Sequence, residues 1–306
     1  MRTWLIGALA AAVFAALPPP AAATADTVVV ASKIDTEGAL LGNMIALLLE
    51  RHGISVENKS QLGPTEIVRR AILAGQIDIY PEYTGDGAVF FKLESDPVWK
   101  DAGRAYEKVK ALDWERNRLV WLAPAPADNS WAIALRKDLA MSQRLATLSD
   151  FARYVVAGGR VRLAASAEFV ESPSALPAFE RLYGFTLKQS QLLVLAGGDT
   201  AATIRAAAEG TSGVNAAMAY GTDGALAVLG LVALADDKGA QIVYQPAPVV
   251  RAAVIERHPE MPSILDPVFR SLTLETLQRL NAKIAVEGLD PTAVAADYLR
   301  AKGFIE

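Results

Sequence analysis

The sequence predicts an α/β protein with two α/β units that are joined by crossing segments. Three observations lead to this fold class. Short apolar runs rich in β-branched residues alternate with helical stretches, this alternation occurs in two parts of the chain, and no long low-complexity linker separates them. The chain of 306 residues is also long enough for two domains of about 100–200 residues each.

The first unit begins with residues 28–32, an uninterrupted apolar run typical of a strand that is covered on both faces. The expected elements of this unit are strands at 28–32, 56–59 and 78–80, and helices at 38–52 and between 63 and 75. The order β-α-β-α-β predicts a parallel sheet with right-handed crossovers.

The second unit repeats this alternation. Its expected elements are strands at 131–135, 161–164, 192–195 and 215–220, and helices at 148–156, 175–183 and 200–209. Helices at 262–269, 274–286 and 291–302 are expected to close the chain. We expect one lobe to comprise residues 26–127 and 223–306, and the other to comprise residues 128–222.

The N-terminus has the pattern of a signal peptide. Arg2 is followed by an uncharged apolar run at 5–17 and by Ala23-Thr24-Ala25, so we expect residues 1–25 to be removed and Asp26 to begin the mature chain. The sequence has no cysteine, which excludes disulfides, thiolate metal sites and a cysteine-linked lipid anchor. These features predict a periplasmic protein.

Charge and motifs argue against several functional classes. Removing the signal peptide moves the formal charge from −4 to −5, which argues against binding nucleic acid through bulk charge. His52 and His258, the two histidines, lack metal-ligand spacing, and no phosphate-loop, dinucleotide or Gly-x-Ser-x-Gly motif is present. We therefore expect neither a metal nor a cofactor.

A cluster of acids and rings lies in the stretch DIYPEYTGDG, residues 78–87. We expect a strand to end at Tyr80 and irregular backbone to follow. Asp78, Glu82 and Asp86 leave open a periplasmic hydrolase that uses paired carboxylates. Against this alternative, the sequence offers no matched base or nucleophile.

Aromatic residues at strand ends favour binding over catalysis. Tyr83, Trp131 and Tyr220 each lie in an expected post-strand loop or at one end of an expected strand, near a lobe boundary, where they can meet in a cleft. Ring faces can hold a quaternary ammonium, which has no proton to donate, at about 0.5–2 kcal/mol per desolvated contact. Core packing is the competing interpretation for each ring.

Several stretches together resemble the osmoprotectant-binding proteins of ABC importers, which bind glycine betaine, choline or carnitine, and most closely the OsmF/YehZ branch. They are SKIDTEGALLGNM, LGPTEIVRRAILAGQIDIYPEYTGDG, APADNSWAIALR, LAASAEFVES, GGDTAATI, NAAMAYGTDG and IAVEGLDP, and they extend from about residue 28 to the C-terminus. The resemblance implies a two-lobed periplasmic-binding-protein fold of the second type, with a ligand cleft between the lobes. It also implies delivery to an inner-membrane permease with cytoplasmic ATPase subunits; we expect a monomer.

The resemblance also implies a set of ligand-binding residues. The cage rings of the family correspond to Tyr83, Trp131 and Tyr220, and a lysine that holds the ligand carboxylate corresponds to Lys33. Polar contacts to the ligand are implied at the positions Asp86, Asn129 and Thr222.

Two departures from the family pattern predict a weak glycine betaine binder, or a binder of a somewhat different compound. Ser172 stands where many relatives have an arginine, and Thr203 aligns with a further cage aromatic. One lost ring contact weakens binding roughly 5- to 30-fold. Substituting Thr203 by tyrosine is therefore expected to tighten betaine binding. A sensor that binds the same solute but reports to a receptor is a further alternative.

Overall fold

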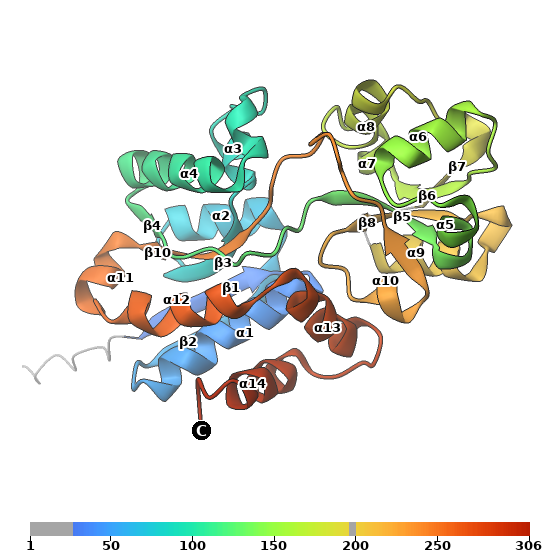
Figure 1. Ribbon diagram of the computed structural model, residues 1–306. Coiled ribbons are helices and arrows are strands. Elements are labelled where there is room, and N and C mark those ends of the chain that lie inside the picture. Colours follow the sequence, from blue (N-terminus) through green and yellow to red (C-terminus); the bar gives the residue numbers. More distant parts are fainter. Residues whose placement is uncertain (1–26, 196–199) are drawn as a thin grey trace, which may run out of the picture.

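The computed structural model describes residues 27–195 and 200–306 of the chain. The predicted signal peptide and its cleavage site before Asp26 lie outside the described residues. Two lobes, each with one mixed sheet and covering helices, stand side by side, as Figure 1 shows. The predicted α/β class with two lobes is confirmed.

Lobe 1 is built on a sheet with the strand order β2-β1-β3-β10-β4. These strands are β1 (Val28–Lys33), β2 (Val56–Gly63), β3 (Ile79–Tyr83), β4 (Leu119–Trp121) and β10 (Pro246–Arg251). Its helices are α1 (Thr36–Arg51), α2 (Thr65–Leu73), α3 (Asp86–Phe90), α4 (Ala102–Asn117), α11 (Ala252–Arg257), α12 (Met261–Ser271), α13 (Leu274–Ala285) and α14 (Pro291–Ala301), with a 3-10 turn at Pro97–Lys100. One hydrophobic core joins the sheet to α1 and α12–α14, and another joins it to α2 and α4.

Lobe 2 is built on a sheet with the strand order β7-β6-β8-β5-β9. These strands are β5 (Trp131–Arg136), β6 (Leu163–Ser166), β7 (Leu192–Leu195), β8 (Ala216–Tyr220) and β9 (Leu231–Ala233). Its helices are α5 (Lys137–Gln143), α6 (Leu148–Val156), α7 (Ala167–Glu171), α8 (Leu176–Tyr183), α9 (Thr200–Glu209) and α10 (Ala225–Val228), with 3-10 turns at Gln189–Gln191 and Thr211–Gly213. Helices α6–α8 cover one face of the sheet and α9 covers the other.

The second predicted lobe boundary, at residues 222 to 223, is too early. Strand β9 pairs with β5 in the sheet of lobe 2, and the chain rejoins the sheet of lobe 1 only at β10. The expected parallel pairing is confirmed for β1, β2 and β3, but neither sheet is parallel throughout. Strand β10 is antiparallel to β3 and β4, and β5 is antiparallel to β8 and β9, because each is the strand that follows a crossing.

Strand β3 runs three residues further than predicted and continues through Pro81 to Tyr83. Pro81 faces Pro248 of the antiparallel strand β10. Neither proline has an N–H group, so neither can donate a backbone hydrogen bond to the other strand at this position. Pairing the two prolines with each other leaves the hydrogen bonds of the neighbouring residues intact. This extension places Tyr83 on rigid strand backbone instead of on a loop.

The two crossing segments run beside each other. Asn129 N donates to Tyr244 O at 2.9 Å, and Ser130 Oγ donates to Ile242 O at 2.7 Å. Next to them, the turn after β8 rests on α13: a Cβ at Gly224 would lie 2.1 Å from Ala282 N. Glycine is therefore required for this close approach between the lobes.

No helix in the described ranges is long and apolar enough to cross a membrane.

Candidate functional site

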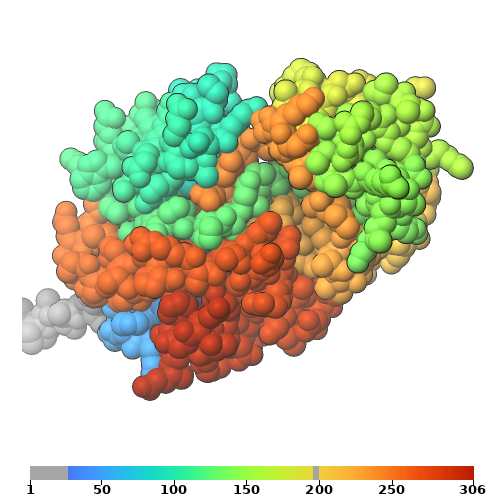
Figure 2. Space-filling model, in the orientation of Figure 1, coloured from blue at the N-terminus to red at the C-terminus, as the bar shows by residue number. Residues whose placement is uncertain are grey.

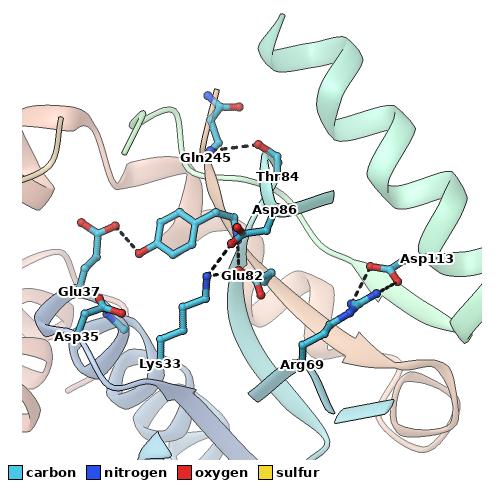
Figure 3. Close-up of polar contacts among 11 residues, drawn as sticks. Lys33, Asp35, Glu37, Arg69, Glu82, Thr84, Asp86, Asp113 and Gln245 are labelled. Atoms are coloured by element: carbon cyan, nitrogen blue, oxygen red, sulfur yellow. Dashed lines mark hydrogen bonds and ion pairs between the residues drawn. The ribbon is translucent and has the colours of Figure 1, made fainter. Parts of the chain in front are cut away.

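Lys33 lies at the C-terminal end of β1, and two acids of lobe 1 surround its ammonium group. Its Nζ is 2.6 Å from Glu82 Oε1 and 2.7 Å from Asp86 Oδ2. Glu82 comes from the neighbouring strand β3, and Asp86 is the first residue of α3 (Figure 3). Parallel strands β1 and β3 end at the same edge, which is why the three side chains meet.

Burial and the mutual charges of Lys33, Glu82 and Asp86 shift the pKa of each of these three groups. Burial works against the Lys33 ammonium, but Asp86 and Glu82 outweigh it and raise the lysine pKa. Burial, with the carboxylate of Asp86, raises the pKa of Glu82, while the Lys33 charge lowers the pKa of Asp86 despite burial. Asp86 is therefore the more persistent anion of the pair.

Tyr83 connects this group to a second buried acid. Its ring lies 4.7 Å from Lys33 Nζ, and its hydroxyl donates to Glu37 Oε1 at 2.9 Å. The other oxygen of Glu37 accepts from Asn281 Nδ2 at 2.7 Å. Burial raises the pKa of Glu37 to about 7, although these hydrogen bonds partly offset it. Neither Glu37 nor Asn281 was predicted from sequence, because an acid in the first turn of a helix is common and a single asparagine in a helix forms no pattern.

We expect Glu37 to make stability depend on pH. Its pKa rises from 4.5 to about 7 on folding, so the folded protein holds this proton more tightly than the unfolded chain. The free energy of unfolding is then highest below pH ~4.5 and falls by on the order of 3 kcal/mol as pH rises towards ~7. In Glu37→Gln this contribution is absent, so the variant gains stability relative to the natural protein over that interval.

Urea unfolding of both proteins between pH 4 and 8 measures this difference. Glu275→Gln, at an exposed position of α13, is the control and is expected to follow the natural protein closely. A constant difference between Glu37→Gln and the natural protein across the pH range would contradict the prediction.

In lobe 2, Trp131 and Tyr220 form an aromatic pair. They are directly opposite each other in the antiparallel pair β5–β8, and their rings stack with centroids 4.3 Å apart. Phe169 supports the indole edge-on at 5.3 Å. Burial, and then charges that include Asp35 and Asp86 of lobe 1, raise the pKa of Tyr220. The pair therefore lies within electrostatic reach of the carboxylates in lobe 1.

A further ring, Tyr244, was missed by sequence analysis. It lies in the second crossing segment, and a Cβ at Gly85 would be 2.7 Å from its Cδ1 atom. Burial, followed by the charge of Asp86, raises the pKa of Tyr244. No strand was predicted from sequence in this part of the chain, so there was no reason to single out this ring.

Thr203 does not join the rings. Its Oγ1 lies 2.9 Å from Thr200 O and 2.7 Å from Met218 O, which share its one hydrogen, and the residue is buried on α9. Trp131 and Tyr220 point from the other face of the sheet, the face covered by α6–α8. The structure thus removes the basis for expecting tighter binding in Thr203→Tyr. Ser172, at the end of α7, bonds to Ser174 Oγ at 2.9 Å.

Asn129 and Thr222 lie at the crossing, where they contact each other. Thr222 Oγ1 donates to Asn129 Oδ1 at 2.6 Å, and Thr222 O accepts from Asn281 Nδ2 at 3.0 Å. These contacts link lobe 2 to α13 and, through Asn281, to Glu37. This geometry supports a role for Asn129 and Thr222 in positioning the two lobes.

The acids of the hydrolase alternative do not all converge. Asp78 accepts hydrogen bonds from Val29 N at 3.0 Å and Arg251 Nη1 at 2.9 Å, at the start of β3. Glu82 is four residues further on, or about 13 Å along an extended strand. Glu82 and Asp86 do meet, but around a lysine rather than around a nucleophile.

The surface is hollowed between the two lobes. Figure 2 shows the hollow between the part of lobe 1 that carries α3 and α4 and the facing part of lobe 2, where the second crossing segment passes.

Comparisons with known proteins are consistent with this arrangement. Residues 26–301 match the family described as the substrate-binding domain of ABC-type glycine betaine transport systems. The chain is 61% identical over 280 residues to the glycine betaine-binding protein YehZ of Escherichia coli, covering 92% of each. It is 33% identical to a glycine-betaine-binding protein of Pseudomonas aeruginosa, covering 91% of this chain and 88% of that protein.

A solved structure agrees with these sequence matches. The structure of apo YehZ from Escherichia coli has a TM-score of 0.81 and 61% sequence identity, and the match covers 92% of this chain and 100% of that one. The two-lobed fold expected from the resemblance is thereby confirmed.

Proposed function

This chain belongs to the family of substrate-binding domains of ABC-type glycine betaine transport systems, and we propose that it binds a quaternary-ammonium osmoprotectant of the glycine betaine type between its lobes. Proteins of this family are binding components of transporters, not enzymes. The hydrolase and sensor alternatives have no support from these relatives.

The stacked pair of Trp131 and Tyr220 is the observation that carries this proposal. Two ring faces at a strand end supply the negative quadrupole that attracts a trimethylammonium group. Tyr83 and Tyr244 supply further rings from lobe 1 and from the crossing. Asp86 adds negative potential that favours a cation.

The transport role follows from the family and is part of the proposal. Closure of the two lobes around ligand, guided by the paired crossing segments, would present the loaded protein to a membrane permease with ATPase subunits. Export through the N-terminal segment, with cleavage after Ala25, would place the protein in the periplasm as a monomer. Ser172 in place of an arginine supports weak binding of betaine.

Calorimetric titration of residues 26–306 with glycine betaine, choline, carnitine and proline betaine tests the proposal. We expect saturable binding of at least one ligand, accompanied by a change in tryptophan emission, because the ammonium would sit against Trp131. The emission change is expected to disappear in Trp131→Phe. No heat and no emission change with any of the four ligands at millimolar concentration would refute a quaternary-ammonium site.

A further inference from the structure

The ammonium of Lys33 is already neutralised by the protein itself. Glu82 Oε1 and Asp86 Oδ2 both lie within 2.7 Å of Nζ, and Lys33 is only 7% exposed. An ammonium group has three donors, so these two acceptors leave one. A ligand carboxylate that approached Lys33 would find that most N–H donors of the ammonium, and all of its charge, are already paired with Glu82 and Asp86.

The two acids contribute differently. Glu82 is fully buried, its Oε1 also accepts from Tyr83 N at 2.8 Å, and its Oε2 has no hydrogen-bond partner among the described residues. The side chain of Asp86 is 18% exposed and stands at the start of α3, so of the two acids it is the one that solvent and a ligand can reach. Asp86 also keeps its charge more readily than Glu82, since Lys33 lowers its pKa.

A ligand with a carboxylate tail therefore meets a like charge. Its tail would have to approach Lys33 beside Asp86 and share the lysine with it, which costs free energy in a buried environment. A cation with a neutral tail meets no such repulsion, and its ammonium gains from the same negative charge.

We propose that Asp86 sets the ligand specificity of this site: by occupying Lys33, it disfavours zwitterions with a carboxylate tail and favours quaternary-ammonium cations with a neutral, hydroxyl-bearing tail. This inference rests on the proposed function, since it concerns the same site. It changes the role of Lys33 from a clamp for the ligand carboxylate, as the family resemblance implies, to a counter-ion for Asp86.

Glycine betaine and choline are suitable probes, because both carry a trimethylammonium group and they differ only in the tail. Betaine ends in a carboxylate, and choline ends in a neutral hydroxymethyl group. Asp86→Asn keeps the shape of the side chain but removes the carboxylate that repels a ligand carboxylate and competes with it for Lys33, while Glu82 stays in contact with the ammonium. At pH 7 the variant is expected to bind betaine at least about tenfold more tightly, the value of one charge-assisted hydrogen bond. Choline is expected to bind equally or more weakly than to the natural protein.

Glu82→Gln is the matched control from the same group. Because Glu82 carries less of the negative charge, this variant is expected to change the betaine-to-choline affinity ratio much less than Asp86→Asn does. Asp86→Ser, which also removes the charge, provides a second test if the asparagine variant is poorly folded. Thermal unfolding of each variant shows whether the fold is kept.

The outcomes separate this inference from the proposed function. An Asp86→Asn or Asp86→Ser variant whose betaine-to-choline ratio equals that of the natural protein overturns the specificity role, as does equal tightening of both ligands. Trp131→Ala tests the site itself: if it leaves both affinities unchanged, the ligands bind elsewhere and the proposed function fails. Loss of both ligands in Trp131→Ala, together with a ratio shifted at least about tenfold by Asp86→Asn, supports both.

Discussion

Replacing Trp131 by alanine is expected to weaken glycine betaine binding about 30-fold or more, the value of about 2 kcal/mol for one desolvated ring contact. The indole stacks on Tyr220 at 4.3 Å with an angle of 27° between the planes, and Phe169 fixes it from the side. Its removal takes away one ring face and also leaves Tyr220 without its stacking partner. The expected loss is therefore larger than for a single isolated contact.

Calorimetry at pH 7 measures this loss, with Trp131→Tyr as the conservative variant that keeps a ring and is expected to recover much of the affinity. Trp114→Ala is the control for losing a tryptophan elsewhere, because Trp114 is 47% exposed on α4 and lies outside the site. Natural affinity in a folded Trp131→Ala protein would rule out the aromatic pair as the ammonium site.

Replacing Asp113 by alanine is expected to lower the free energy of unfolding by about 3–5 kcal/mol, as for other buried pairs that lose one partner. Asp113 is fully buried on α4, and its oxygens accept from both terminal nitrogens of Arg69. They also accept from Trp121 Nε1 and Asn117 Nδ2, each at 2.7 Å. Figure 3 shows this pair to the right of the strand that carries Glu82. The variant would leave the buried guanidinium of Arg69 without a counter-charge.

Urea unfolding measures this loss, and two further variants show its origin. Asp297→Ala removes an exposed partner, 3.2 Å from Arg300, and is expected to cost less than about 1 kcal/mol. Replacing Arg69 and Asp113 together by leucines is expected to recover much of the stability, since no unpaired charge remains. A cost below about 1 kcal/mol for Asp113→Ala would mean that water reaches Arg69.

The sequence was a good guide where local signals are strong. The strands at 28–32 and 192–195 and the helices at 148–156 and 200–209 are continuous apolar or periodic stretches, and the structure has them at or near these positions. Strands β4 and β9 are only three residues long, and β10 contains two prolines, so their local signals are weak or contrary. These strands depend on neighbours that are distant in sequence.

The site, too, has parts that local sequence signals predict and parts that depend on contacts between distant segments. The strand ends that carry Trp131 and Tyr220 could be identified from sequence, because a ring at the start or end of an apolar run is a local feature. The meeting of Lys33 with Glu82 and Asp86 depends on β1 lying beside β3, and no spacing along the chain reveals it. Thr203 was misplaced because the alignment gave no information on which face of the sheet α9 covers.

The order of the segments along the chain has a consequence for biosynthesis. The sheet of lobe 2 is continuous in sequence, whereas helix α1 near the beginning of lobe 1 is covered by α12, α13 and α14 at the very end. Thr292 Oγ1 bonds to Asn43 Oδ1 at 3.1 Å, and Arg51 pairs with Glu306, the last residue. A nascent chain that has reached residue 245 can thus complete lobe 2, while the apolar face of α1 stays uncovered until residues 261–306 have been made. Lobe 1, the first to be started, is the last to close.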